Sequence, residues 1–153
     1  MIAAAVALVR EKGPDVTMDD VAEAANVSKP TVYRNVGDKA ALAAALAEIL
    51  TDRLNRAAEQ AVASSPPGRE SFAAGVRSML EVIDEDRNLF VFVNSGWATT
   101  EHVQRLVERS SAQMIEQFRP SRRAVGLDPD VARTWAYAIV GALKVTAMMW
   151  RRD

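Results

Sequence analysis

Cysteine is absent from this sequence of 153 residues, and histidine occurs once, at His102. A chain without cysteine forms no disulfide framework and no thiolate metal site, and it is compatible with a reducing cytoplasm. A single histidine, with no second histidine and no cysteine to join it, does not support a metal site or a catalytic dyad. We therefore expect no metal and no cofactor, and we expect His102 to be exposed in the first turn of its helix.

Neither sign of charge dominates the sequence, and no apolar run is long. The 19 Lys and Arg residues face 20 Asp and Glu residues, which gives a net charge of −1. This balance excludes a protein that coats nucleic acid non-specifically, so any DNA contact must come from a local patch. No run approaches the roughly 18 apolar residues of a membrane span. The apolar start of the chain lacks the basic region and the cleavage site of a signal peptide.

Apolar residues recur at spacings of three and four along most of the chain, which is typical of amphipathic helices. The stretch 88–95 has the Phe and Val content of a strand, but no second strand is available to pair with it, so we predict a short buried helix. The sequence thus predicts an all-α protein of about eight helices without a sheet. Few residues precede the first helix and no stop signal follows the last, so we expect a chain that is clipped at both ends.

The stretch Thr17 to Lys39 predicts two short helices joined by a tight turn. Thr17 and Asp20 have the spacing of a capping box, with Asp in place of the usual Glu or Gln. After a break at residues 26–29, Ser28 is a suitable second N-cap, and Pro30 lies in the first turn, where its missing N–H costs nothing. This is the arrangement of a helix-turn-helix, whose second helix can enter the DNA major groove.

Residues 21–42 read V-A-E-A-A-N-V-S-K-P-T-V-Y-R-N-V-G-D-K-A-A-L and resemble the tetracycline-repressor (TetR) family of bacterial transcription regulators. The likeness is detailed over about residues 2–50 and architectural beyond them. It implies an N-terminal three-helix DNA-binding domain over 1–47 and a helical ligand-binding and dimerisation domain over 48–153. Three positions depart from the family pattern: Asn26 replaces a turn glycine, Pro30 a small residue, and Val36 a phenylalanine. Asn tolerates a left-handed backbone better than most residues, so we expect the turn to form.

The resemblance also implies a set of DNA-binding residues. Lys29 and Asn35 are candidates for base contacts, because Lys can donate to guanine and Asn can pair with adenine. Thr31, Tyr33 and Lys39 suit phosphate contacts at helix N-termini. The full set of expected DNA-binding residues is Thr17, Ser28, Lys29, Pro30, Thr31, Tyr33, Arg34, Asn35 and Lys39. Outside this motif, Tyr33 would be a packing residue, Asn35 a cap or surface residue, and Lys29 and Arg34 a solvated face.

For the second domain, the resemblance implies a largely apolar ligand pocket with a few polar groups that fix orientation. The expected lining residues are Phe90, Phe92, Asn94, Trp97, Ser110, Met114 and Trp135. A packing role in the core is the alternative for each of them, because periodicity does not separate a core face from a cavity wall. Small residues along the final helix allow another helix to approach closely, and the resemblance implies a homodimer formed through the last two long helices of each subunit.

The sequence therefore predicts a cytoplasmic DNA-binding transcription regulator, most often a repressor, that a small apolar ligand releases from palindromic operator DNA. The competing interpretation is a helical small-molecule-binding or interaction module that no longer reads DNA. An enzyme is not expected, because the chain has no nucleophile motif, metal cluster or phosphate loop. The acidic stretch Asp84-Glu85-Asp86 is expected to be a solvated helix end.

Overall fold

The computed structural model describes residues 1–153 except 96–98, 118, 120–125, 127 and 151–153. The described residues form helices and no strands, so the predicted all-α fold is confirmed. The helices are α1 (Ile2–Lys12), α2 (Met18–Ala24), α3 (Lys29–Val36), α4 (Lys39–Ala63), α5 (Arg69–Glu85), α6 (Arg87–Val93), α7 (Thr100–Gln117) and α9 (Pro129–Trp150). No described helix has the length and apolar character that crossing a membrane requires.

The chain divides into two compact units, which interleave along the sequence. The first unit consists of Met1–Leu50 and Asp84–His102, and we name it the reader unit after the DNA-binding role that the sequence predicts for it. The second unit consists of Thr51–Ile83 and Val103–Asp153. Helix α4 is continuous and contributes its first half to the reader unit and its second half to the second unit. The stretch around α6 belongs with the N-terminal helices, whereas the resemblance to the TetR family implies a ligand-binding domain that begins at residue 48.

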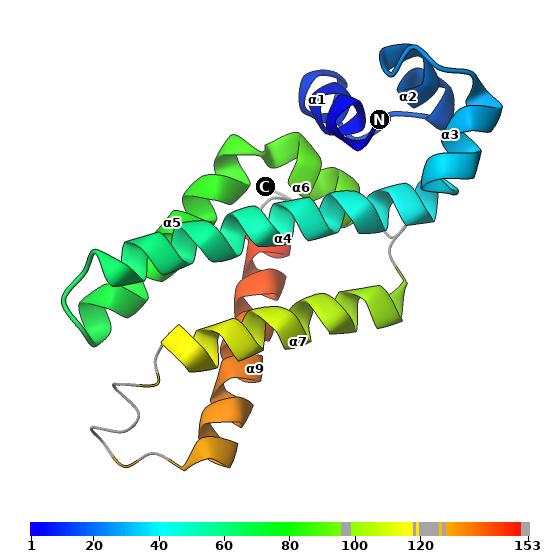
Figure 1. Ribbon diagram of the computed structural model, residues 1–153. Coiled ribbons are helices and arrows are strands. Elements are labelled where there is room, and N and C mark those ends of the chain that lie inside the picture. Colours follow the sequence, from blue (N-terminus) through cyan, green and yellow to red (C-terminus); the bar gives the residue numbers. More distant parts are fainter. Residues whose placement is uncertain (96–98, 118, 120–125, 127, 151–153) are drawn as a thin grey trace. The chain divides into compact units, whose positions relative to one another are not determined.

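In the reader unit, α1, α2 and α3 pack together and α6 lies against α1 (Figure 1). Their apolar residues form a small core, because each short helix turns one apolar stripe inward. The core contains Val9, Val21, Val32, Leu42 and Leu46, each at most 1% exposed. The stretch 88–95, which composition alone would assign to a strand, forms α6 with Leu89 and Phe92 fully buried.

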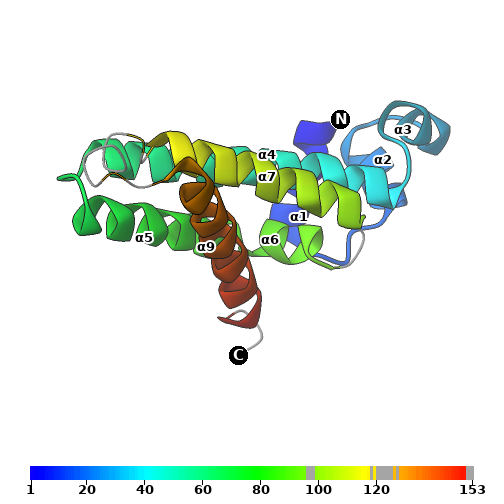
Figure 2. The same cartoon turned by 90° about the horizontal axis from the view of Figure 1, so that it is seen from below.

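In the second unit, α9 crosses α7, as both Figure 1 and Figure 2 show. Helix α7 is tied to the second half of α4 by polar contacts: the Arg109 guanidinium pairs with the Asp52 carboxylate, and Gln113 donates to the Asn55 carbonyl oxygen over 3.5 Å. Gly75 of α5 brings that helix against α4, since a Cβ at this position would lie 3.1 Å from Val62. These contacts define a helical bundle around α4.

Candidate nucleic-acid interface

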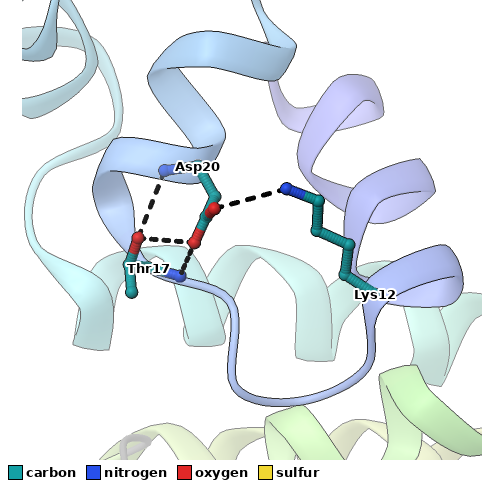
Figure 3. Close-up of polar contacts among 3 residues, drawn as sticks. All are labelled: Lys12, Thr17 and Asp20. Carbon is teal, nitrogen blue, oxygen red and sulfur yellow. Dashed lines mark hydrogen bonds and ion pairs between the residues drawn. The ribbon is translucent and has the colours of Figure 1, made fainter.

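The capping box predicted at the start of α2 is present (Figure 3). The Asp20 backbone N–H donates to Thr17 Oγ1 over 3.2 Å, and the Thr17 backbone N–H donates to Asp20 Oδ2 over 2.8 Å. These bonds satisfy two of the N–H groups that a helix start leaves without partners. The hydrogen bonds from Thr17, with a smaller contribution from Lys12, lower the pKa of Asp20 to about 2. Asp20 is therefore charged throughout the neutral and mildly acidic range.

The turn between α2 and α3 has the backbone that the sequence predicts. Asn26 has a φ of 52°, the left-handed conformation that its family counterpart, glycine, adopts without strain. The Val27 N–H reaches back to the Ala22 carbonyl oxygen over 3.0 Å, which closes the turn. The replacement of glycine by Asn26 thus leaves the helix-turn-helix geometry intact.

Helix α3 exposes nearly all of its side chains. Val32, 0% exposed, anchors the helix on the core, while Tyr33 is 44% exposed and Arg34 and Asn35 lie fully at the surface. Ser28 occupies the N-cap position, but its hydroxyl pairs with the Thr31 hydroxyl over 2.9 Å and does not bond the helix backbone. A helix with a single buried contact and an outer row of polar side chains is suited to lie in a groove of DNA.

The two candidate base-contacting residues both have partners within the protein. The Lys29 ammonium lies 2.7 Å and 3.0 Å from the two carboxylate oxygens of Asp19 on α2, and this contact raises the pKa of Lys29. The Asn35 amide donates to the Thr31 carbonyl oxygen over 2.8 Å. Asp19 was not among the predicted site residues. Its position ten residues before Lys29 gives no periodic signal, because the contact depends on the turn between the helices.

Lys39 is the first residue of α4. Asp38 caps this helix, because its carboxylate accepts a hydrogen bond from the Ala41 backbone N–H over 2.8 Å. The Lys39 ammonium lies 5.9 Å from the centre of the Phe92 ring, within the range of a cation–π contact. A predicted phosphate-binding residue is therefore in contact with α6, a helix that is distant in sequence.

Helix α1 is fastened to the start of α6 by a two-pronged ion pair. The Arg10 guanidinium donates to both Asp86 oxygens over 2.6 Å and 2.8 Å, and the Asn88 amide donates to the Arg10 carbonyl oxygen over 2.9 Å. The hydrogen bond to Asp86 raises the pKa of Arg10. Asp86 is only 4% exposed, so the expectation of a solvated acidic helix end is wrong at this residue. A planar guanidinium matches a carboxylate at two points, which fixes orientation as well as distance.

The predicted ligand-lining residues that the structure describes belong to both units. Phe90 and Phe92 are buried in the reader unit, 7% and 0% exposed, and the Asn94 amide is bonded to the Phe90 carbonyl oxygen over 2.8 Å. Trp97 lies outside the described residues. In the second unit, Ser110 and Met114 are half-buried on α7, whereas Trp135 is 62% exposed on α9.

Buried polar groups in the second unit occur at positions that the sequence analysis did not single out. Asn55 Nδ2 and Ser111 Oγ are buried and have no hydrogen-bond partner among the described residues. Burial lowers the pKa of Lys144, which lies half-buried on α9. At the end of the reader unit, His102, predicted to be exposed, is 5% exposed, and its backbone N–H donates to the capping Thr99 hydroxyl over 3.2 Å. The helical period of α7 places Ser111, and not its neighbour Ser110, on the fully buried line.

The fold and this surface define a helix-turn-helix protein with an exposed second helix. Residues 1–46 match the family described as bacterial regulatory proteins, tetR family, which supports the resemblance found in the sequence. An uncharacterised HTH-type transcriptional regulator of Mycobacterium tuberculosis (strain CDC 1551 / Oshkosh) is 27% identical over 153 residues, which cover 95% of this chain and 63% of the relative. The HTH-type transcriptional activator FasR of Mycolicibacterium smegmatis is 28% identical over 77% of this chain and 62% of its own length. The chain thus spans less than two thirds of the length of these relatives.

Proposed function

We propose that the chain is a sequence-specific DNA-binding transcription regulator whose reader is α3. The observation that carries the proposal is the geometry of that helix: a capped helix-turn-helix in which Val32 alone of α3 is fully buried, while Lys29, Pro30, Tyr33, Arg34 and Asn35 are exposed. Thr17, Ser28, Thr31, Tyr33 and Lys39 supply hydroxyl, phenol and ammonium groups for phosphate contacts. Lys29 and Asn35 contact base edges, with Pro30 and Arg34 beside them.

Substitution of Asn35 tests the base-reading role. Asn35→Ala should weaken binding to the preferred duplex by about tenfold and leave binding to a scrambled duplex nearly unchanged, because base contacts are made only at the correct sequence. Tyr33→Phe, the matched phosphate-contact variant, should weaken binding to both duplexes alike. Fluorescence anisotropy with labelled duplexes measures both constants. A uniform loss for Asn35→Ala would remove Asn35 from the base-reading set.

We further propose that a small, largely apolar ligand in the second unit controls DNA binding. Helix α4 supports this mechanism, because one continuous helix carries Lys39 at its start and the Asn55 amide in the second unit. A ligand that shifts α4 would move Lys39 and the adjoining helix α3, and would so change how α3 meets DNA. By linkage, operator DNA must then weaken ligand binding by the same factor by which ligand weakens operator binding. Unequal factors in the two titrations would contradict the mechanism.

We propose that the regulator is a homodimer, and the supporting observation is the exposed apolar surface of α9. Apart from Tyr137, its described exposed apolar residues recur at alternating spacings of four and three, which places them on one stripe of the helix. They are Val131, Trp135, Ala138, Ala142, Val145 and Met149. We name this stripe the α9 seam and propose a second copy of the chain as its partner. A two-fold dimer places two readers about 34 Å apart, which fits palindromic DNA.

The direction of regulation is proposed to be repression, with the protein acting in the cytoplasm. A reporter gene placed behind the selected DNA site distinguishes repression from activation, the direction named for the M. smegmatis relative. The competing function is an interaction module that does not read DNA. Such a module would show no preferred duplex and no steep dependence of binding on salt, whereas a reader that displaces counterions must show both.

A further inference from the structure

The ion pair between Lys29 and Asp19 lies at the leading end of the proposed reader. Lys29 is the first residue of α3, and the first turn of a recognition helix is the part that meets base edges. Both side chains are accessible, 54% exposed for Lys29 and 66% for Asp19. A carboxylate is thus held within 3.0 Å of an ammonium that DNA could contact.

The neighbouring acid on the same helix has a different task. Asp20 is engaged in the capping box with Thr17 and lies beside Lys12 at 3.4 Å. Asp19 instead directs its carboxylate to the ammonium of the next helix. In the first turn of α2, Asp20 therefore caps the helix, whereas Asp19 lowers the net positive charge at the start of α3.

A carboxylate at this place affects phosphates and bases differently. A phosphate that approaches Lys29 is repelled by Asp19 and must compete with it for the ammonium. Guanine O6 and N7 are uncharged acceptors, and an ammonium has three donors, so Lys29 can donate to guanine while it keeps Asp19. The ion pair thus weakens phosphate contacts and leaves base contacts intact.

We propose that Asp19 is a specificity-determining residue of the reader, which by pairing with Lys29 suppresses binding to non-specific DNA. This inference rests on the proposed function and extends it to a residue outside the motif. Asp19 does not increase affinity for the preferred site; it lowers affinity for all other sites, which raises the ratio between them.

The test compares Asp19→Asn with Glu23→Gln. Both changes remove one negative charge from α2, and Glu23 is an exposed acid one turn beyond Asp19. Dissociation constants are measured from low to high salt for the preferred duplex and for a scrambled duplex. Asp19→Asn should tighten binding to the scrambled duplex about fivefold at low salt. The slope of log affinity against log salt should steepen by about 0.9 per subunit, as for one added phosphate contact.

Binding of Asp19→Asn to the preferred duplex should change less than twofold, and Glu23→Gln should change neither duplex by more than that. In a Lys29→Gln background, the gain from Asp19→Asn should vanish, because the gain acts through the freed ammonium. Thermal melting followed by circular dichroism verifies that each variant is folded.

Three results would overturn the inference: equal effects of the two variants, a gain that persists without Lys29, or an unchanged ratio between preferred and scrambled DNA. Failure of the proposed function looks different, since the wild-type chain would then select no preferred sequence. In that case, binding to the scrambled duplex still tests whether Asp19 suppresses non-specific binding. A gain for Asp19→Asn that Glu23→Gln lacks supports it, and no gain contradicts it.

Discussion

The reader unit and the second unit differ in how they treat their polar groups. In the reader unit, three helix ends are closed by side-chain hydrogen bonds, at Thr17, Asp38 and Asn88. In the second unit, Asn55 Nδ2 and Ser111 Oγ are buried without hydrogen-bond partners among the described residues. Buried polar atoms in folded proteins are normally bonded, so two such atoms in one unit require an explanation.

The two units also differ in their apolar surfaces. The exposed face of α3 is polar apart from Pro30 and the Tyr33 ring, whereas the α9 seam exposes large side chains such as Trp135 and Met149, 62% and 65% exposed. The difference teaches that α3 offers mainly polar groups at its surface, as a helix that contacts nucleic acid requires. In the second unit, the two buried polar atoms and the exposed apolar stripe are the features on which the proposed ligand site and the proposed dimer rest.

The largest expected effect concerns the α9 seam. Trp135→Asp should weaken self-association at least about 100-fold, because a charge replaces a large aromatic side chain at the centre of an apolar contact. Sedimentation velocity over a concentration series measures the change. Arg133→Asp is the matched control, since Arg133 is exposed on the same helix but outside the seam. A wild-type chain that stays monomeric at high concentration would contradict the proposed dimer.

The next effect concerns the contact between α1 and α6. Arg10→Met keeps the apolar stem but leaves the nearly buried Asp86 carboxylate without its two-pronged partner, at a cost of about 2 kcal/mol in the free energy of unfolding. Urea unfolding followed by circular dichroism gives this value. Lys12→Met, which removes an exposed ion pair to Asp20, should change stability little. Equal losses for the two variants would show that the Asp86 contact contributes no more than a surface pair.

A smaller effect follows from the lowered pKa of Asp20. A carboxylate whose pKa falls from an ordinary 3.8 to about 2 on folding stabilises the protein above pH 3.8. This contribution is lost as the pH falls from about 4 towards 2. Asp20→Asn should therefore lower stability at neutral pH and remove that part of the acid-induced decline, as measured by urea unfolding from pH 6 to 2.5. Asp15→Asn, an exposed acid in the same loop, should leave the decline in place.

The smallest effect separates the two kinds of buried serine in the second unit. Ser111→Ala should leave stability unchanged or raise it by up to about 1 kcal/mol, because the hydroxyl has no partner to lose. Ser71→Ala should cost about 1 kcal/mol, because the Ser71 hydroxyl donates to the Gly68 carbonyl oxygen over 2.9 Å. A loss for Ser111→Ala as large as that for Ser71→Ala would mean that the Ser111 hydroxyl has a stabilising partner.

Local features of the fold could be predicted from the sequence because their causes are local. The capping box of Thr17 and Asp20, the left-handed Asn26 and the cap at Asp38 each depend on residues a few positions apart. The burial of Asp86 could not be predicted, because its partner Arg10 lies 76 residues away in the sequence. The ion pair of Asp19 depends in the same way on the geometry of a turn.

The second unit was the harder part to predict. Helical periodicity marks apolar positions but does not say whether another helix, a ligand or a second chain covers them. Trp135 was therefore expected at a pocket wall, whereas the structure has it at the surface. The same holds for His102 in the reader unit, which lies in a first turn that is typically exposed but is buried by tertiary packing.

The central claim is that the reader unit recognises DNA sequence, and selection of bound duplexes from a random pool at low salt tests it most directly. The account predicts a palindromic motif whose half-sites have centres about 10 base pairs apart, the spacing of successive major grooves. It also predicts that Asn35→Ala alters this motif. Recovery of unrelated sequences by the wild-type chain would contradict the claim and favour a helical module that does not read DNA.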